Sequence, residues 1–255
     1  MKYKEFCEEI ARKANALIMN KFENGFEKYE KGTNDIVTTA DTAVNALVIQ
    51  EIAQAYPDHD VLGEEESSMK NNSEYVWICD PICGTIPFSQ KIPTMGFMLA
   101  LTHNGRPIAA VVSLPATHTV VYAEQGAGCY VNGERTRTTP TNDFGHVTYT
   151  DWPTAPHRLR GVYDALTDDN LNVADFGSMP APATALATGT LSGLILTALS
   201  VYDGVAVDLV VIEAGGVITD FLGEIIDYQK PMHGIIAASD AAMHQRLFAI
   251  VQNAQ

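Results

Sequence analysis

The hydrophobic period of the chain changes after Pro57, and this change limits the folds that the chain can adopt. Before Pro57, apolar side chains recur at helical spacing over Lys4–Phe22 and again after Asp41, which is expected to cap the second helix. A polar loop over Glu23–Asp35 leads from the first helix toward the second. After Pro57, short β-prone runs alternate with turn residues. The order predicts an antiparallel sheet backed by two helices, with hairpin turns at Gly105 and Asn132–Gly133 and strands at Val61–Leu62, Tyr75–Cys79, Gly96–Thr102, Ala109–Leu114 and Val120–Glu124.

The second part of the chain mixes strands with helices. One predicted helix, Gly204–Glu213, is closed by Gly215–Gly216, because glycine adopts the left-handed conformation that ends helices. A chain of 255 residues can form two closely packed halves, and no long linker separates them. We predict an N-terminal α+β half over residues 1–140 and a C-terminal α/β half over residues 141–255, with strands at Val147–Thr150, Val173–Phe176 and Leu194–Leu196.

Composition excludes several classes of protein. Hydrophobic residues make up 46% of the chain and charged residues 18%, which is typical of an ordered globular protein. The net charge of −15 argues against a general nucleic-acid binder, because the phosphate backbone would be repelled. A protein this acidic needs local cations to handle an anionic substrate, and bound metal ions would supply them.

No apolar segment of about 18 residues occurs, so we predict no membrane contact. The first residues, MKYKEFCEEI, lack the apolar region of a signal peptide. The four cysteines are too few for a disulfide framework in a chain of this length. Together these features predict a cytoplasmic protein.

Acidic residues gather at three places where loops meet regular elements. They are the run Gly63–Glu66, the segment Asp80–Thr85 after a predicted strand, and Asp203 at the start of a predicted helix. Mg²⁺ binds carboxylate and carbonyl oxygens, so the three clusters could form one metal site. Taken singly, each also fits an ordinary solvated loop, turn or helix cap.

Four motifs occur in the same order as in a known family. The inositol monophosphatase family has a Lys-Gly-x-x-Asp-x-Val-Thr-x-x-Asp segment, then Gly-Glu-Glu, then Asp-Pro-Ile/Leu-Asp-Gly-Thr. A Trp-Asp pair follows, with a helix that runs to Glu-Ala-Gly-Gly. This chain resembles that family through Lys31–Asp41, Gly63–Glu65, Asp80–Thr85, Tyr202–Asp203 and Glu213–Gly216.

The resemblance implies an α+β fold, a layered α-β-α-β-α sandwich of the inositol monophosphatase and fructose-1,6-bisphosphatase type. It also implies hydrolysis of a small sugar or polyol phosphate monoester by a metal-activated water, with Mg²⁺ as cofactor, and assembly as a homodimer. Glu64, Asp80 and the carbonyl of Ile82 look like ligands of the first metal. Asp80 and Asp203 look like ligands of the second, together with the position that Cys83 holds.

The same resemblance implies roles for catalytic and substrate-binding residues. Thr85 and Asp41 resemble the pair that orients and deprotonates the attacking water alongside Glu64. The expected substrate-binding segments are the phosphate cradle Ile82, Cys83, Gly84 and Thr85 and the hydroxyl-contacting segment Gly177, Ser178 and Met179.

Cys83 departs from the family, which has aspartate at this position. Thiolate is a soft ligand and does not replace a carboxylate for Mg²⁺. Three interpretations follow: a weaker second site that fills when substrate phosphate adds ligands, a different metal, or an impaired relative kept for binding a phosphorylated ligand or protein. We favour the first, because Glu64, Asp80, Thr85 and Asp203 are all present.

Two further features concern Cys83 and the substrate. Ser89 stands where a cysteine-nucleophile phosphatase needs arginine, and Cys79, although it forms Cys-x-x-x-Cys with Cys83, is expected in the core. Leu196 occupies the position at which inositol-specific members carry glutamate. An apolar side chain cannot accept a hydrogen bond from a sugar hydroxyl, so strict inositol specificity is not expected.

Overall fold

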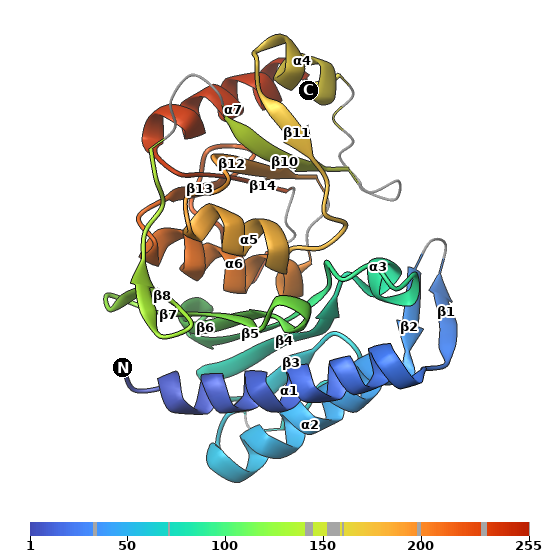
Figure 1. Cartoon of the computed structure of the whole chain (residues 1–255). Coiled ribbons are helices and arrows are strands. Elements are labelled where there is room, and N and C mark those ends of the chain that lie inside the picture. Colours follow the sequence, from blue (N-terminus) through green and yellow to red (C-terminus); the bar gives the residue numbers. More distant parts are fainter. Residues whose placement is uncertain are drawn as a thin grey trace.

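The computed structural model of the chain consists of five layers in the order α-β-α-β-α, which confirms the predicted α+β sandwich (Figure 1). A pair of helices covers a seven-stranded sheet, a second pair lies between that sheet and a five-stranded sheet, and a third pair covers the far side. The structure describes residues 1–32, 35–70, 72–140, 145–151, 159, 161–197, 200–230 and 234–254. In this part of the chain no helix is both long and apolar enough to cross a membrane.

The first layer contains α1 (Lys4–Asn24) and α2 (Thr39–Ala55), and both predicted helices are confirmed. Each buries one side against the sheet, as apolar residues at helical spacing require. The expected loop between them was wrong, because it contains β1 (Lys28–Gly32), which pairs antiparallel with β2 (Asp35–Thr38). Every side chain of β1 is exposed, so no alternation of polar and apolar residues marked it as a strand.

The N-terminus of α2 differs from the prediction by one turn. Thr38 is the N-cap, and Asp41 lies at the third helical position rather than at the cap. The Thr38 hydroxyl accepts a hydrogen bond from Ala40 N at 3.1 Å, and Thr38 N donates to Asp41 Oδ2 at 2.9 Å. This reciprocal capping box fixes the Asp41 carboxylate at the helix start.

The seven-stranded sheet is antiparallel except at one edge. We predicted a wholly antiparallel sheet, but β3 and β4 run parallel because the segment after β3 turns back along it, with Ser68 opposite Val61. The expected turns at Gly105 and Asn132–Gly133 are confirmed by their positive φ angles. In sheet order the strands are β3 (Asp60–Gly63), β4 (Tyr75–Cys83), β5 (Gly96–His103), β6 (Arg106–Leu114), β7 (Thr119–Glu124), β8 (Gly128–Val131) and β9 (Glu134–Thr136).

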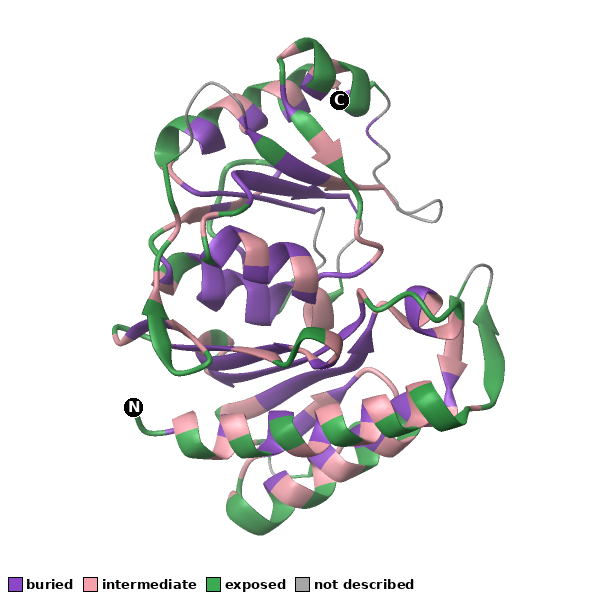
Figure 2. Cartoon of the chain, in the orientation of Figure 1, coloured by how far each residue is buried: buried purple, intermediate pink, exposed green. Residues whose placement is uncertain are grey.

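The middle layer contains α5 (Pro180–Ala187) and α6 (Val201–Glu213), which are buried on nearly every side (Figure 2). Both are apolar around most of their circumference, as a helix between two sheets must be. The predicted start of α6 was three residues late, whereas its end before Gly215, at φ 94°, is confirmed. α6 joins the two sheets through one shared core.

The five-stranded sheet and its outer helices complete the fold. Its strands are β11 (Asn172–Ala174), β10 (His146–Thr150), β12 (Gly193–Leu196), β14 (Ile235–Ala238) and β13 (Val217–Asp220), in sheet order. β11 ends two residues before the predicted strand did. The division into halves at Pro140 stays a prediction. The remaining helices are α3 (Thr85–Ser89), α4 (Val162–Asp168), α7 (Ala241–Ala254) and the 3-10 turn Pro115–Thr117.

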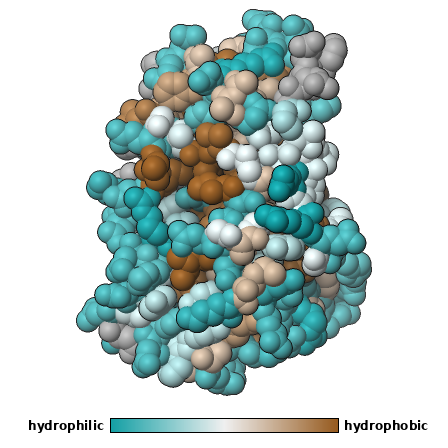
Figure 3. Space-filling view, turned by 90° about the vertical axis from the view of Figure 1, so that its left-hand side faces the viewer, coloured by the Kyte–Doolittle hydropathy of each residue, from teal (hydrophilic) through white to brown (hydrophobic). Residues whose placement is uncertain are grey.

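Apolar side chains gather on the face of the molecule that Figure 3 turns toward the viewer. Large exposed hydrophobic residues in the C-terminal part of the chain include Ile212 on α6, Leu222 and Ile225. Most large apolar side chains are buried, so a concentration of exposed ones on one side is a candidate contact surface.

The middle layer should contribute more to stability than its exposed edge does. Leu209 is 3% exposed and Ile212 is 51% exposed, although both lie on α6. We expect Leu209→Ala to lower the free energy of unfolding by about 2–5 kcal/mol, because it leaves a cavity between the sheets. Ile212→Ala should change it by only about 0.5 kcal/mol. Urea denaturation measures both, and equal losses would contradict the buried position of α6.

Candidate metal centre

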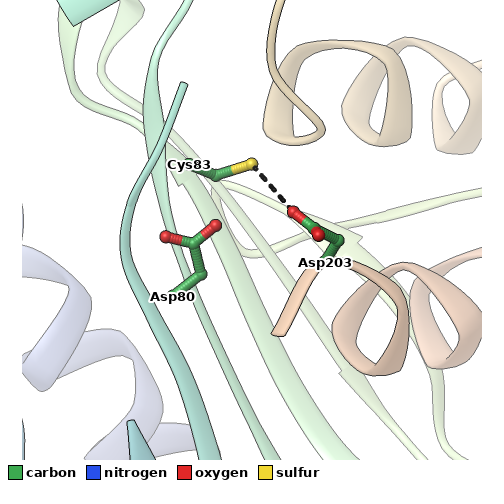
Figure 4. Close-up of side chains that lie close together, drawn as sticks. All are labelled: Asp80, Cys83 and Asp203. Atoms are coloured by element: carbon green, nitrogen blue, oxygen red, sulfur yellow. Dashed lines mark hydrogen bonds between the residues drawn. The ribbon is translucent and has the colours of Figure 1, made fainter. Parts of the chain in front are cut away.

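Asp80, Cys83 and Asp203 lie together between β4 and the first turn of α6 (Figure 4). One ligand atom from each residue lies within 4.8 Å of the other two. The Cys83 Sγ is 3.8 Å from Asp203 Oδ1. Two of the three acidic segments singled out in the sequence therefore meet at one point, although 120 residues separate Cys83 from Asp203.

A bulge in β4 brings Asp80 and Cys83 to the same face of the sheet. In a regular strand, residues three apart point to opposite faces. Here Asp80 pairs with Met98 and Cys83 pairs with Gly96, so β4 has one residue more than β5 over this stretch. Pro81 lies in the bulge, where its missing N–H disrupts no ladder bond. The strand thus continues past Cys79, where we predicted its end.

The bulge also separates the two cysteines of the Cys-x-x-x-Cys motif. Cys79 belongs to the core under α1 and α2, whereas Cys83 belongs to the core that contains α5 and α6. They lie on opposite faces of the sheet, which excludes a Cys79–Cys83 redox pair in this fold. The expectation that Cys79 is a core residue is confirmed.

Asp203 is positioned by a second capping box. Ser200 caps α6, and Ser200 N and Oγ donate to Asp203 Oδ2 at 3.1 and 2.7 Å. Asp203 therefore lies at the third helical position, not at the N-terminus where we placed it. Since Oδ2 is occupied by the cap, Oδ1 is the oxygen that faces Cys83.

Thr85 and Asp41, which the family resemblance pairs, lie within hydrogen-bond distance of each other, and their role toward a water molecule stays a prediction. The Thr85 hydroxyl lies 3.1 Å from Asp41 Oδ1 and 3.1 Å from the Ile82 carbonyl oxygen. The other carboxylate oxygen of Asp41 accepts hydrogen bonds from Thr38. Because both oxygens of Asp41 are held, the orientation of the Thr85 hydroxyl is fixed by the starts of α2 and α3.

Glu64 reaches the centre from the end of β3. Its backbone N–H donates to the Cys79 carbonyl at 3.1 Å, which ties the acidic run to β4. Lys31 Nζ lies 3.6 Å from Glu64 Oε1 and also pairs with Glu65. Lys31 is the first residue of the Lys31–Asp41 family motif, and the sequence predicted no role for it, because nothing local indicated that β1 would place it beside Glu64.

Negative charge at the centre exceeds the positive charge beside it. Burial raises the pKa of Glu64 to about 7; Lys31 opposes this shift, and Asp203 and Glu65 add to it. Burial, followed by the charges of Glu64 and Asp203, holds the pKa of Asp80 well above its ordinary value. Burial also raises the pKa of Asp203. A divalent cation at this place would reverse these directions, because it favours the ionised carboxylates.

Asp80 carries the clearest sign of an additional ligand. Asp80 is 3% exposed, and its buried Oδ1 has no hydrogen-bond partner among the residues that the structure describes. Asp208, another buried carboxylate on α6, accepts a hydrogen bond from the Tyr228 hydroxyl at 3.0 Å. An unpartnered buried carboxylate oxygen costs free energy unless a cation binds it. The oxygens of Glu64 and Asp80 fit Mg²⁺, but the sulfur of Cys83 does not.

The predicted substrate segments lie against each other. Gly84 has φ +92°, and a Cβ added there would lie 2.7 Å from Ser178 Cβ, so only glycine fits this turn. The Ser178 hydroxyl donates to the Thr94 carbonyl, and Met179 N donates to Cys83 Sγ at 3.2 Å. Met179 and Ser178 therefore contact Cys83 and Gly84 of the predicted phosphate cradle. The contact of both residues with substrate stays a prediction.

The fold and the acidic cluster define a layered α+β protein with a candidate site for metal ions. The sequence matches the inositol monophosphatase family over residues 2–255, and the chain belongs to that family.

Several relatives share this architecture. "Nus factor SuhB" of Escherichia coli (strain K12) is 33% identical over 221 residues, which are 84% of this chain and 83% of that protein. An IMPase structure from Thermotoga maritima has a TM-score of 0.88 at 26% identity and covers 100% of this chain and 98% of its own. The suhB protein of Bartonella henselae has a TM-score of 0.91 at 24% identity, with both chains fully covered, which shows the common fold.

The raised pKa of Glu64 predicts how stability depends on pH. Between its ordinary pKa of 4.5 and its folded value of about 7, the folded chain holds a proton that the unfolded chain releases. The free energy of unfolding of chelator-treated protein should therefore fall as pH rises through this window. Added divalent cation should restore stability most at pH 7 and above, because it binds the ionised form.

Urea midpoints between pH 4.5 and 8 measure this effect. Glu64→Gln should flatten part of the slope. Glu66→Gln, in the same acidic run but exposed, should keep it. A stability that rises through this window in the chelated native protein would contradict the assignment.

Proposed function

We propose that this chain is an Mg²⁺-dependent phosphatase that hydrolyses a small sugar or polyol phosphate monoester. The observation that carries the proposal is the buried, unpartnered Asp80 Oδ1 beside Glu64 and Asp203. Thr85, which follows Asp80–Cys83 along the chain, lies 3.1 Å from Asp41 Oδ1 through its hydroxyl. Such a cluster costs stability in the metal-free chain, and binding of a divalent cation offsets that cost.

The proposed ligands of the first ion are Glu64, Asp80 and the Ile82 carbonyl, and those of the second are Asp80 and Asp203. When bound, the cations would activate a water molecule and neutralise charge on the phosphate. Side chains of the protein therefore have to orient the water and accept its proton.

Thr85 and Glu64 are the proposed partners of the attacking water. Thr85 donates its one hydroxyl proton to Asp41 or to the Ile82 carbonyl, so its lone pairs can accept a hydrogen bond from the water. Glu64 is the proposed acceptor of the water proton, which is the role that the family resemblance implies for this position. The water oxygen forms a bond to phosphorus, the ester P–O bond breaks, and the alcohol leaves with a proton from solvent.

The proposed phosphate cradle is the backbone of Ile82, Cys83, Gly84 and Thr85. The left-handed Gly84 and the start of α3 support this placement, because the first N–H groups of a helix have no partner within it. Leu196 is 2% exposed and offers no hydrogen-bond acceptor to a sugar hydroxyl. We therefore propose a substrate range wider than inositol phosphates.

Phosphate release from a panel of sugar and inositol phosphates tests this function with Mg²⁺, Mn²⁺ or Zn²⁺. Turnover by the native protein should disappear in Asp80→Asn. It should fall by about 10²-fold or more in Glu64→Gln and Thr85→Ala, which lose proton transfer or water placement. Glu66→Gln is the matched control and should keep native turnover. Turnover that survives Asp80→Asn would refute the metal-dependent mechanism.

A second candidate is a catalytically impaired family member that binds a phosphorylated ligand or a protein partner. Cys83 favours it, because the second site lacks one hard ligand. The relative named "Nus factor SuhB" has a name that states no enzymatic activity. A binding protein of this kind should keep its ligand affinity in Asp80→Asn, whereas the phosphatase needs this carboxylate.

We also propose that the chain forms a homodimer in the cytoplasm. The apolar face in Figure 3 supports self-association, and the four buried free cysteines suit a reducing compartment. Sedimentation analysis should give the mass of two chains. A species with the mass of one chain at micromolar concentration would contradict the dimer.

A further inference from the structure

The donor atoms between β4 and α6 differ in kind from those at the Glu64 side of the centre. Asp80 and Asp203 supply carboxylate oxygens, and Cys83 supplies sulfur. Replacing aspartate by cysteine keeps a ligand that can carry one negative charge, but it changes a hard oxygen to a soft, polarisable sulfur. Cations that prefer sulfur differ from those that prefer oxygen. The change therefore alters which ion binds more than whether an ion binds.

We propose that Asp80, Cys83 and Asp203 bind a thiophilic divalent cation of the Zn²⁺ class through the Cys83 thiolate, and that Mg²⁺ is excluded from this position. The inference deepens the proposed function, since it names the metal class of its second site, and it rests on that function only for the use of the ion in catalysis. Mg²⁺ at the Glu64 side remains compatible with it.

The spacing of the donor atoms suits a tetrahedral ion. Zn²⁺ binds sulfur at about 2.3 Å and carboxylate oxygen at about 2.1 Å, and a tetrahedral angle then separates the two donors by about 3.6 Å. The Cys83 Sγ and Asp203 Oδ1 are 3.8 Å apart. Adjacent oxygens around octahedral Mg²⁺ lie only about 2.9 Å apart. Zn²⁺ would replace the Cys83 thiol proton between these two atoms, and Asp80, whose ligand atom lies within 4.8 Å of both, would complete the protein ligands.

Each donor is already oriented toward the shared point. The backbone N–H of Met179 donates to Cys83 Sγ at 3.2 Å, which holds the sulfur in place. The cap at Ser200 holds Asp203 Oδ2 and leaves Oδ1 toward the sulfur. Asp80 Oδ1 is buried and unpartnered. Outer contacts of this type orient ligands in zinc sites.

Three protein donors fill three of the four positions of a tetrahedral ion. Catalytic zinc sites have three protein ligands and one open position, which water or substrate occupies. Binding replaces the proton on Cys83 with the cation and releases that proton to solvent. No oxidant or reductant is needed, so the exchange is a simple metal-for-proton substitution.

Co²⁺ is the probe that reports the sulfur ligand directly, because thiolate–Co²⁺ bonds give charge-transfer absorption in the near ultraviolet. We expect this absorption in the full-length native protein and its loss in both Cys83→Ser and Cys83→Asp. Cys129→Ala, which removes another buried cysteine from the same core, should keep it. Zn²⁺ should displace Co²⁺ at equal concentration, and a large excess of Mg²⁺ should not. Calorimetric titration should show at least about 10-fold weaker Zn²⁺ binding in Cys83→Ser.

The outcomes separate this inference from the proposed function. Absence of the absorption band in the native protein, its persistence in Cys83→Ser, or displacement of Co²⁺ by Mg²⁺ would overturn the thiolate site. Turnover with Mg²⁺ and no band would leave the phosphatase intact and refute the inference. A band without turnover would support the thiolate site and count against the phosphatase. Far-ultraviolet circular dichroism confirms that each variant is folded, and Cys83→Asp restores the residue usual in the family.

Discussion

The buried carboxylates between β4 and the first turn of α6 are the constraint on which the surrounding structure depends. Taking a carboxylate out of water costs several kcal/mol, and Asp80 is buried with Asp203 beside it. The two sheets and the helices between them supply the opposing term, since each buried valine or leucine contributes about 1.5–3 kcal/mol. α6 serves both purposes. It buries Val205, Val207 and Leu209 in the shared core and presents Asp203 at its first turn.

Local backbone features then orient each of these side chains. The bulge at Pro81 turns Asp80 and Cys83 to one face, and the capping boxes at Thr38 and Ser200 each hold one oxygen of an aspartate. The second oxygen of Asp41 accepts a hydrogen bond from the Thr85 hydroxyl, and that of Asp203 lies 3.8 Å from Cys83 Sγ. Two capped helix N-termini and one β-bulge therefore set the geometry of the site.

Much of this arrangement could be predicted from the sequence. Helices were predicted at Lys4–Phe22, from the helical spacing of its apolar residues, and at Gly204–Glu213, from the glycines that close it, and both lie within the observed α1 and α6. β1 was missed because it is exposed on both faces. The strand at Val61–Leu62 was predicted, but its parallel pairing with β4 was not, because pairing direction depends on a distant partner. The order of the family motifs predicted that Asp41 lies near Thr85 and that Asp80 lies near Asp203. The spacing of these residues along the chain does not predict either contact. The bulge and the contact of Lys31 with Glu64 depend on tertiary pairing and left no local signal.

Cys83 shows how little of a site has to change for its chemistry to change. The sulfur accepts a hydrogen bond from the Met179 N–H and lies 3.8 Å from Asp203 Oδ1, so the thiol is held at the position where the family motif has a carboxylate. The carboxylates around it keep the demand for a cation, because Asp80 Oδ1 has no other partner. What the substitution alters is the preference among cations, through the softness of one donor atom. A site under these two conditions, unchanged charge demand and changed ligand type, selects a different ion before it loses metal binding altogether.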